Sequence, residues 1–174
     1  MKSKDIAIVG ILLAIGAILR YFLAMLHTPL TPNMIIAFYC LAIILIHPKV
    51  YEALGIGLVA GILSMLISGS IFPPANLISE PVGALVCFGV YALLKNRFKL
   101  APVVTTFLAT LASGFTFAAL ALIAVAPQIL AKYATMEGFI LVFVPIVVIT
   151  AVFNAIIVQI LYIPSNRVLS RGQE

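Results

Sequence analysis

Long apolar runs alternate along the chain with short segments that hold prolines and polar residues. A helix rises ~1.5 Å per residue, so most of these runs match the roughly 30 Å hydrocarbon layer of a bilayer. The pattern predicts six membrane-spanning helices, the second of which is short for a span. Their expected positions are residues 6–26, 34–46, 52–67, 79–94, 102–126 and 138–163.

The composition supports this interpretation. Hydrophobic residues make up 64% of the chain and charged residues 9%, which is far from the ranges of soluble domains. The segments between the runs are too short for a folded aqueous domain, so residues 1–174 are expected to form one transmembrane domain. Cys40 and Cys87 lie in apolar runs without neighbouring metal-ligand residue types, which indicates buried thiols and no metal site.

The basic residues predict the orientation. An even number of spans places both termini on one side, and that side holds eight of the ten Lys and Arg residues. The positive-inside rule then predicts cytoplasmic N and C termini. Because topology explains the positive charge, no nucleic-acid partner is implied. The eight residues are Lys2, Lys4, Lys49, Lys95, Arg97, Lys99, Arg167 and Arg171.

Two opposite charges are expected in the outer layer of the membrane. Arg20 lies about six residues, or roughly 9 Å, inside the outer end of the first helix. Glu80 follows Ser79 and precedes Pro81, a combination that predicts the start of the fourth helix on the same side. Such a pair would suit a ligand that arrives from outside. The alternatives are that Arg20 extends to the lipid headgroups, that Glu80 satisfies a helix N-terminus, or that the two simply pair.

Further candidates are polar and aromatic side chains near this layer. Asn76 and Asn154 lie near or in spans, although an amide deep in a helix often serves only as an inter-helix hydrogen bond. Tyr39 and Phe143 belong to a set of aromatic residues in the outer half of the chain. Aromatic walls with one cation and one anion would suit a zwitterion with a flat apolar side chain. The expected ligand-binding residues are Arg20, Tyr39, Asn76, Glu80, Phe143 and Asn154.

Catalysis finds little support in the residue inventory. The chain has one Asp, its two His residues fall on opposite sides of the predicted membrane, and no lysine-containing phosphate loop is present. No cofactor is expected, and nothing in the sequence could bind ATP. We therefore expect a protein that is not an enzyme.

A docking face is predicted on the first helix. Gly10 and Ala14 are four residues apart and so share one helix face, on which another helix can approach closely. The chain length, the six predicted spans and this small-residue pair resemble the substrate-binding S components of energy-coupling-factor (ECF) transporters. The resemblance implies a six-helix bundle in a bacterial cell membrane that binds a nutrient on its outer side.

The same resemblance implies a set of partners. Gly10 and Ala14 would dock on the transmembrane coupling subunit, which works with two cytosolic ATPases, and the S component would topple in the membrane to release its ligand. Residues 28–33 and 68–76 would close over the ligand.

More narrowly, residues 2–7 and 76–81 look like the tryptophan-specific S components, so tryptophan is the expected ligand. An S component for a vitamin, a stand-alone secondary carrier and a structural six-helix subunit remain as alternatives.

Overall fold

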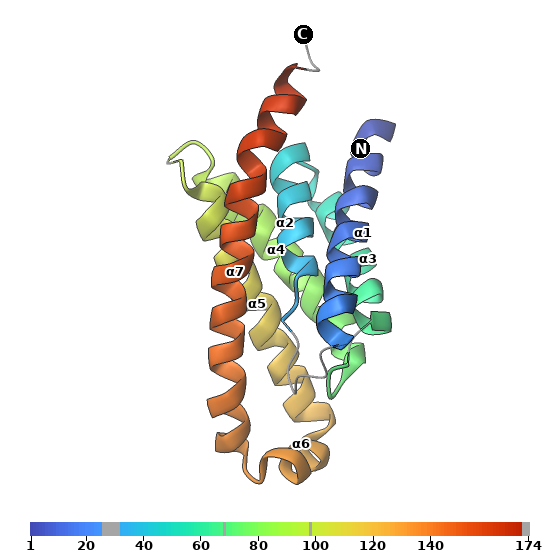
Figure 1. Cartoon of the computed structure of the whole chain (residues 1–174), viewed down its shortest axis with the longest axis vertical. Helices are drawn as coiled ribbons and strands as arrows, with labels where there is room; N and C mark the ends of the chain where they lie inside the picture. The colour runs from blue at the N-terminus through green and yellow to red at the C-terminus, as the bar shows by residue number, and fades with distance from the viewer. Residues whose placement is uncertain (26–31, 68, 98, 172–174) are drawn as a thin grey trace.

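The computed structural model describes residues 1–25, 32–67, 69–97 and 99–171, and this part of the chain is all-helical, without a strand (Figure 1). Seven α-helices and one short 3-10 helix, η1, follow one another. Their bounds are α1 Ser3–Met25, α2 Ile35–Ile46, α3 Val50–Ile67, η1 Pro73–Ala75, α4 Asn76–Leu94, α5 Ala101–Ala124, α6 Ala126–Tyr133 and α7 Met136–Arg171.

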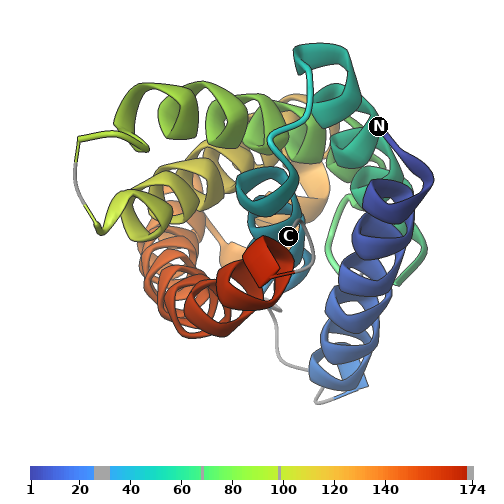
Figure 2. The same cartoon turned by 90° about the horizontal axis from the view of Figure 1, so that it is seen from above.

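Helix α2 is the centre of the bundle. Seen from above, α1, α3, α4, α5 and α7 surround it, and it contacts all five (Figure 2). Every residue from 35 to 44 is buried. A helix that is apolar on all sides suits such surroundings, because none of its faces needs water. The long helices run lengthwise, and both termini lie at the same end (Figure 1).

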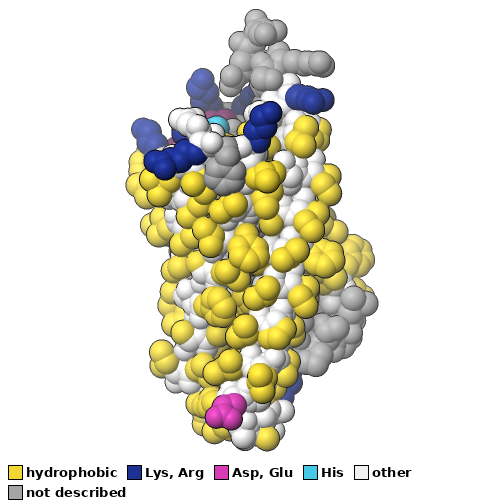
Figure 3. Space-filling model, turned by 90° about the vertical axis from the view of Figure 1, so that its left-hand side faces the viewer, with side chains coloured by type: hydrophobic (Ala, Val, Ile, Leu, Met, Phe, Trp, Pro, Cys, Tyr) yellow, Lys and Arg dark blue, Asp and Glu magenta, His cyan; other side chains and the backbone are white. Residues whose placement is uncertain are grey.

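Five helices of the described chain are long and apolar enough to cross a membrane, and α2, with 12 residues, is the shorter sixth helix of the bundle. Hydrophobic side chains cover the outer surface of the bundle between its two ends (Figure 3). The prediction of an all-α membrane protein is thus confirmed.

Helices α3 and α4 approach each other closely through glycines. A Cβ atom added to Gly57 would lie 2.7 Å from the Cα atom of Pro81, and one added to Gly61 would lie 2.7 Å from the carbonyl oxygen of Asn76. Only glycine fits such contacts without displacing the neighbouring backbone. These two glycine contacts fix where the first turns of α4 lie against α3.

Three expected boundaries are wrong. Helix α7 continues to Arg171, eight residues past the expected end at residue 163. Helix α4 begins at Asn76, directly after η1, and not at Ser79; the 3-10 turn through Pro73 and Pro74 leads into it, so Ser79 has no capping role. Residues 128–133, expected as loop, belong to α6. Pro127 stands in its first turn, where a proline is well accommodated, and buried Ile129 holds the short helix against the bundle.

Candidate ligand-binding site

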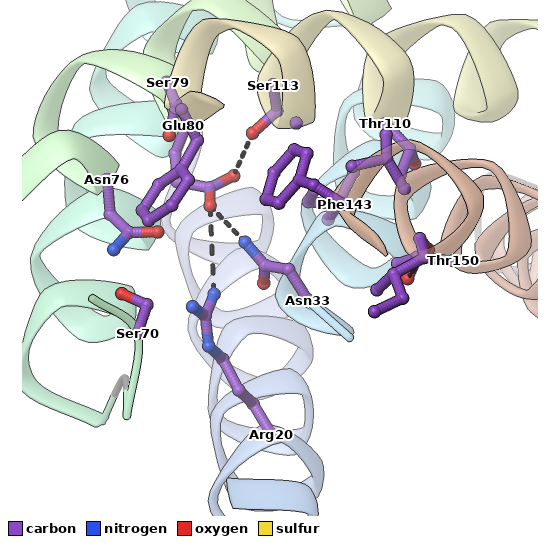
Figure 4. Close-up of a pocket in the computed structure, with 15 residues that line it drawn as sticks. Arg20, Asn33, Ser70, Asn76, Ser79, Glu80, Thr110, Ser113, Phe143 and Thr150 are labelled. Carbon is purple, nitrogen blue, oxygen red and sulfur yellow. Dashed lines mark hydrogen bonds and ion pairs between the residues drawn. The ribbon is translucent and has the colours of Figure 1, made fainter. Parts of the chain in front are cut away.

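A small cavity with both polar and apolar walls lies between α1, the start of α2, α4, α5 and α7 (Figure 4). Its volume is about 80 Å³, room for several waters. Four of the six predicted ligand-binding residues line it: Arg20, Asn76, Glu80 and Phe143. The structure thus brings together residues from three helices that are far apart in the sequence.

Arg20 and Glu80 form a buried ion pair. The Arg20 Nη1 atom lies 3.8 Å from Glu80 Oε1, and the same nitrogen donates a hydrogen bond of 2.9 Å to Ser64 Oγ on α3. Arg20 is 4% exposed and Glu80 is fully buried. The arginine therefore points into the bundle and not toward the headgroups. Of the alternatives for these residues, the structure shows direct pairing.

Glu80 has two further partners. Asn33 Nδ2 donates to its Oε1 atom, and Ser113 Oγ on α5 donates to its Oε2 atom at 3.2 Å (Figure 4). A buried carboxylate is strongly unfavourable unless such partners compensate for lost hydration. Glu80 consequently joins four parts of the bundle: α1, the segment that leads into α2, its own helix and α5.

Asn154 and Tyr39, the other two predicted ligand-binding residues, are not among the lining residues. Asn154 Nδ2 donates to the backbone oxygen of Asn33 at 3.1 Å and to Thr110 Oγ1 at 3.3 Å. Asn154 thus lies behind the cavity and holds Asn33 in place. Tyr39 is fully buried in α2, and its hydroxyl oxygen lies only 2.2 Å from where a Cβ atom on Gly83 would be.

Three buried polar atoms at the cavity have no hydrogen-bond partner within the described part of the chain. They are Arg20 Nε, Asn33 Oδ1 and Ser79 Oγ, and all three residues line the cavity. An unsatisfied buried polar atom costs about 1–3 kcal/mol, so native proteins rarely keep one without a reason. The cavity therefore presents a donor and acceptors that a polar guest could satisfy.

Aromatic rings form another side of the cavity. Phe143 stacks with Phe117, with ring centroids 6.3 Å apart, and with Phe139 at 5.2 Å. Phe117 and Phe143 line the cavity, while Phe72 packs against the same cluster from the segment before α4. Asn76 is positioned by its own turn, because its Nδ2 atom donates to the Pro73 carbonyl at 2.7 Å. One side of the cavity is charged and another is flat and apolar.

Sequence reasoning missed Asn33, Ser64 and Ser113. Two of them carried a usable signal. Ser113 continues the polar face of α5 that Thr106 and Thr110 begin, and Ser64 extends the Gly57 and Gly61 face of α3. Asn33 stands outside any helical period and carried no such signal. Within the described residues, no group of three or more His, Cys, Asp or Glu side chains could hold a metal ion.

Comparisons with known proteins point to one family. Residues 2–170 match the family model described as "Tryptophan transporter TrpP". The chain is also similar to a probable tryptophan transport protein of Bacillus subtilis (strain 168), with 32% identity over 176 residues, covering 99% of this chain and 96% of that protein. No solved structure matches it. The narrower resemblance found in the sequence is thus confirmed over almost the full length, and the chain belongs to the TrpP family of tryptophan transporters, a family of transport proteins and not of enzymes.

Proposed function

We propose that this protein is the membrane-embedded binding subunit of a tryptophan importer. It would hold tryptophan as a zwitterion in the cavity between Arg20 and Phe143, which must widen from about 80 Å³ to admit the indole ring. One observation carries the proposal. In a chain of a tryptophan transporter family, a buried cation, a buried anion and unsatisfied polar atoms lie beside an aromatic wall.

Arg20 would bind the carboxylate of the ligand. Its Nε atom has no partner among the described residues, and its Nη1 atom is shared between Ser64 and the longer contact to Glu80. A guanidinium group can hold a carboxylate through two parallel hydrogen bonds, one from Nε and one from an Nη atom. The ligand carboxylate would then approach the guanidinium from its unpartnered edge.

Glu80 and Asn33 would bind the ammonium group. The Asn33 Oδ1 atom is a buried acceptor with no donor among the described residues, and Glu80 supplies the negative charge next to it. The ammonium group has three donors, so it can satisfy both. The ligand ammonium group would either displace the Asn33 Nδ2 group from the Glu80 carboxylate or bind that carboxylate together with it.

Phe117 and Phe143 would contact the indole ring. Offset stacking between aromatic rings adds about 0.5–1.5 kcal/mol to the burial of their area. Asn76 lines the same cavity and has its Nδ2 atom engaged by Pro73, which leaves its amide oxygen as the proposed acceptor for the indole N–H.

The proposal extends to an ECF-type S component with six spans and cytoplasmic termini. Gly10 and Ala14 are exposed on α1, and a Cβ atom on Gly10 would meet nothing within 4 Å, so this face is open to a transmembrane coupling subunit with its two ATPases. Lys and Arg side chains gather at the end of the bundle where both termini lie, as the positive-inside rule requires (Figures 1 and 3).

The proposed closure over the ligand concerns two segments. In the segment 68–76, Ser70 lines the cavity and Phe72 packs on the aromatic cluster, which supports a covering role. In the segment 28–33, residues 28–31 lie outside the described residues. Asn33, at its end, contacts Glu80.

A binding titration tests the proposal. The chain contains no Trp, so indole emission from the purified protein reports on the ligand alone. Tryptophan should bind, while tryptamine and indole-3-propionate, which each lack one charge, should bind roughly 30-fold to several thousand-fold more weakly, because each leaves a buried partner unpaired. Equal binding of both analogues would refute the zwitterion site, and failure of all three would refute the ligand. Uptake by the isolated protein without ATPases would favour a secondary carrier.

A further inference from the structure

A second cavity lies at the opposite end of the bundle, near the termini. It has a volume of about 340 Å³ and is formed where α4 ends, where α5 begins and where α7 passes. Among the described residues it shares no lining residue with the ligand cavity. Polar side chains from all three helical regions face it: Tyr91, Lys95, Lys99, Gln159 and Tyr162.

The charge of this cavity is positive. Lys95 and Lys99 line it, and no acidic side chain does so within the described part of the chain. The two tyrosines Tyr91 and Tyr162 also line it. A site with two ammonium groups and no carboxylate favours an anion and disfavours a cation.

Gln159 adds a second, independent requirement. Its Oε1 atom is buried and has no hydrogen-bond partner among the described residues. Such an acceptor is satisfied by a donor, for example a hydroxyl group. An anion that also carries a hydroxyl group would meet both requirements of the cavity.

The position of the cavity points to the membrane surface. Lys95 directly follows α4, and Ala101 begins α5, so the cavity lies where two spans end. At this end of the bundle the apolar surface gives way to Lys and Arg side chains (Figure 3). Pro102 and the half-exposed Ile163 continue the lining with apolar groups. Phosphate groups of lipids lie at this depth, with their acyl chains beside the apolar surface.

We propose that this cavity binds the headgroup of an anionic glycerophospholipid with free hydroxyl groups, of the phosphatidylglycerol type. Lys95 and Lys99 bind the phosphate, a glycerol hydroxyl donates to Gln159 Oε1, and the acyl chains leave past Ile163 into the bilayer. Phosphatidylcholine cannot donate a hydrogen bond to Gln159, and the ammonium group of phosphatidylethanolamine meets two lysines. The cavity therefore distinguishes these headgroups by both charge and hydrogen bonding.

Native mass spectrometry of the delipidated full chain tests the proposal. Phosphatidylglycerol, phosphatidylethanolamine and phosphatidylcholine with identical acyl chains are added separately. The first phosphatidylglycerol molecule should bind at least tenfold more tightly than either zwitterionic lipid. Lys95→Gln with Lys99→Gln should reduce this preference to about that of a zwitterionic lipid. Lys2→Gln with Lys4→Gln removes the same charge outside the cavity. This variant should keep the preference for phosphatidylglycerol within about twofold of the wild type.

Two further variants keep the test decisive if the double glutamine variant folds poorly. Lys95→Arg with Lys99→Arg retains the charge and should retain the lipid. Gln159→Met, which removes the acceptor, should weaken phosphatidylglycerol binding about threefold to tenfold and leave phosphatidylcholine binding unchanged.

Any of three results would overturn the proposal of a lipid site. Equal affinity for phosphatidylglycerol in the Lys95 and Lys99 glutamine variant and in the Lys2 and Lys4 variant would place the lipid elsewhere. Equal affinity of the wild type for all three lipids would remove the headgroup preference. Displacement of the lipid by micromolar glycerol phosphate would identify a site for a soluble phosphate ester instead of a membrane lipid.

Discussion

Helices α1 and α2 are both strongly apolar, yet they occupy opposite kinds of position. Helix α2 lies in the centre of the bundle with ten consecutive residues buried. Helix α1 lies at the periphery, and only five of its residues are buried: Val9, Leu13, Gly16, Ala17 and Arg20. In a membrane both surroundings are apolar, so hydrophobicity alone does not distinguish a central helix from a lipid-facing one.

The difference lies in the exceptions to the apolar pattern. Helix α1 contributes a charged side chain to the cavity and leaves Gly10 and Ala14 uncovered, whereas α2 offers a continuous core between the other helices. Gly16 lets the two helices meet, because a Cβ atom there would lie 3.2 Å from the Cα atom of Ile35. Helix α2 holds the bundle together, whereas α1 is the helix that we propose contacts a ligand and a partner.

The largest expected effect concerns the uncovered face of α1. Gly10→Leu with Ala14→Leu should reduce tryptophan uptake in cells to background, because bulky side chains prevent close approach of the coupling subunit. Tryptophan binding by the purified variant should remain within about twofold, since neither residue lines the cavity. Leu19→Phe, which adds bulk on a different face of α1, is the control. Normal uptake by the double variant would exclude docking through this face.

The second-largest effect is expected from the two buried charges, Arg20 and Glu80. Arg20→Ala and Glu80→Gln should each weaken tryptophan binding by roughly 30-fold to several thousand-fold, because one ligand charge loses its partner in a site shielded from water. The tryptophan affinity of Arg20→Lys should lie between those of these variants and the wild type, since lysine keeps the charge but lacks the planar guanidinium group. The measurement is indole fluorescence. Unchanged affinity in Arg20→Ala would show that the pair only joins helices.

The hydrogen bonds of Asn154 behind the cavity should affect tryptophan affinity less. Asn154→Leu removes the hydrogen bonds to the Asn33 backbone and to Thr110, and it should weaken tryptophan binding about fivefold to thirtyfold. Thr105→Val is a suitable control, because the buried Thr105 hydroxyl has no hydrogen-bond partner among the described residues. If both variants bind equally well, the position of Asn33 does not depend on Asn154.

The same substitution on the two helices tests the comparison directly. Ala42→Leu on α2 introduces bulk into fully buried space and should cost about 1–3 kcal/mol, lowering the thermal midpoint in detergent by roughly 2–12 °C. Ala14→Leu on α1 places the same atoms on an exposed face and should leave the midpoint unchanged. Equal effects of the two substitutions would contradict the assigned central and peripheral positions.

The smallest effect is expected at the end of α2. His47 follows the helix, and partial burial together with nearby Lys95 lowers its pKa below the usual value of 6.5. The unfolded chain then binds more protons, so stability should fall slightly as the pH drops below about 6.5 and should level off below the folded pKa. His47→Asn, which suits the left-handed backbone there, should flatten thermal midpoints between pH 5 and 7. An unchanged pH profile would remove His47 as the cause.

Much of the fold could be predicted from the sequence, because a bilayer forces each span to be a long apolar helix. The observed α1, α3 and α5 begin or end within a few residues of expectation. Depth along the helices placed Arg20 and Glu80 in one layer, but their direct pairing was only one of the alternatives. Helix α6 was missed because its eight residues lack a long apolar run.

The finer choice of site residues could not be predicted. Asn154 and Tyr39 occur at depths similar to those of lining residues, yet they face neighbouring helices. In a membrane helix the lipid-facing and core-facing sides are both apolar, so the pattern does not reveal which way a lone polar residue points. The packing of α2 brings Asn33 next to Glu80, and no pattern in the neighbouring sequence predicts this contact.

The shortness of α2 also has an electrostatic effect. The helix begins inside the protein, and Ile36 in its first turn lines the cavity that contains Glu80. The aligned peptide dipoles of a helix place roughly half a positive charge at that end, next to amide groups that have no partner in the preceding turn. Helix α4 begins beside the same cavity with Asn76. The N-terminus of α2 thus gives this part of the bundle a positive potential that favours a carboxylate even before any side chain is considered.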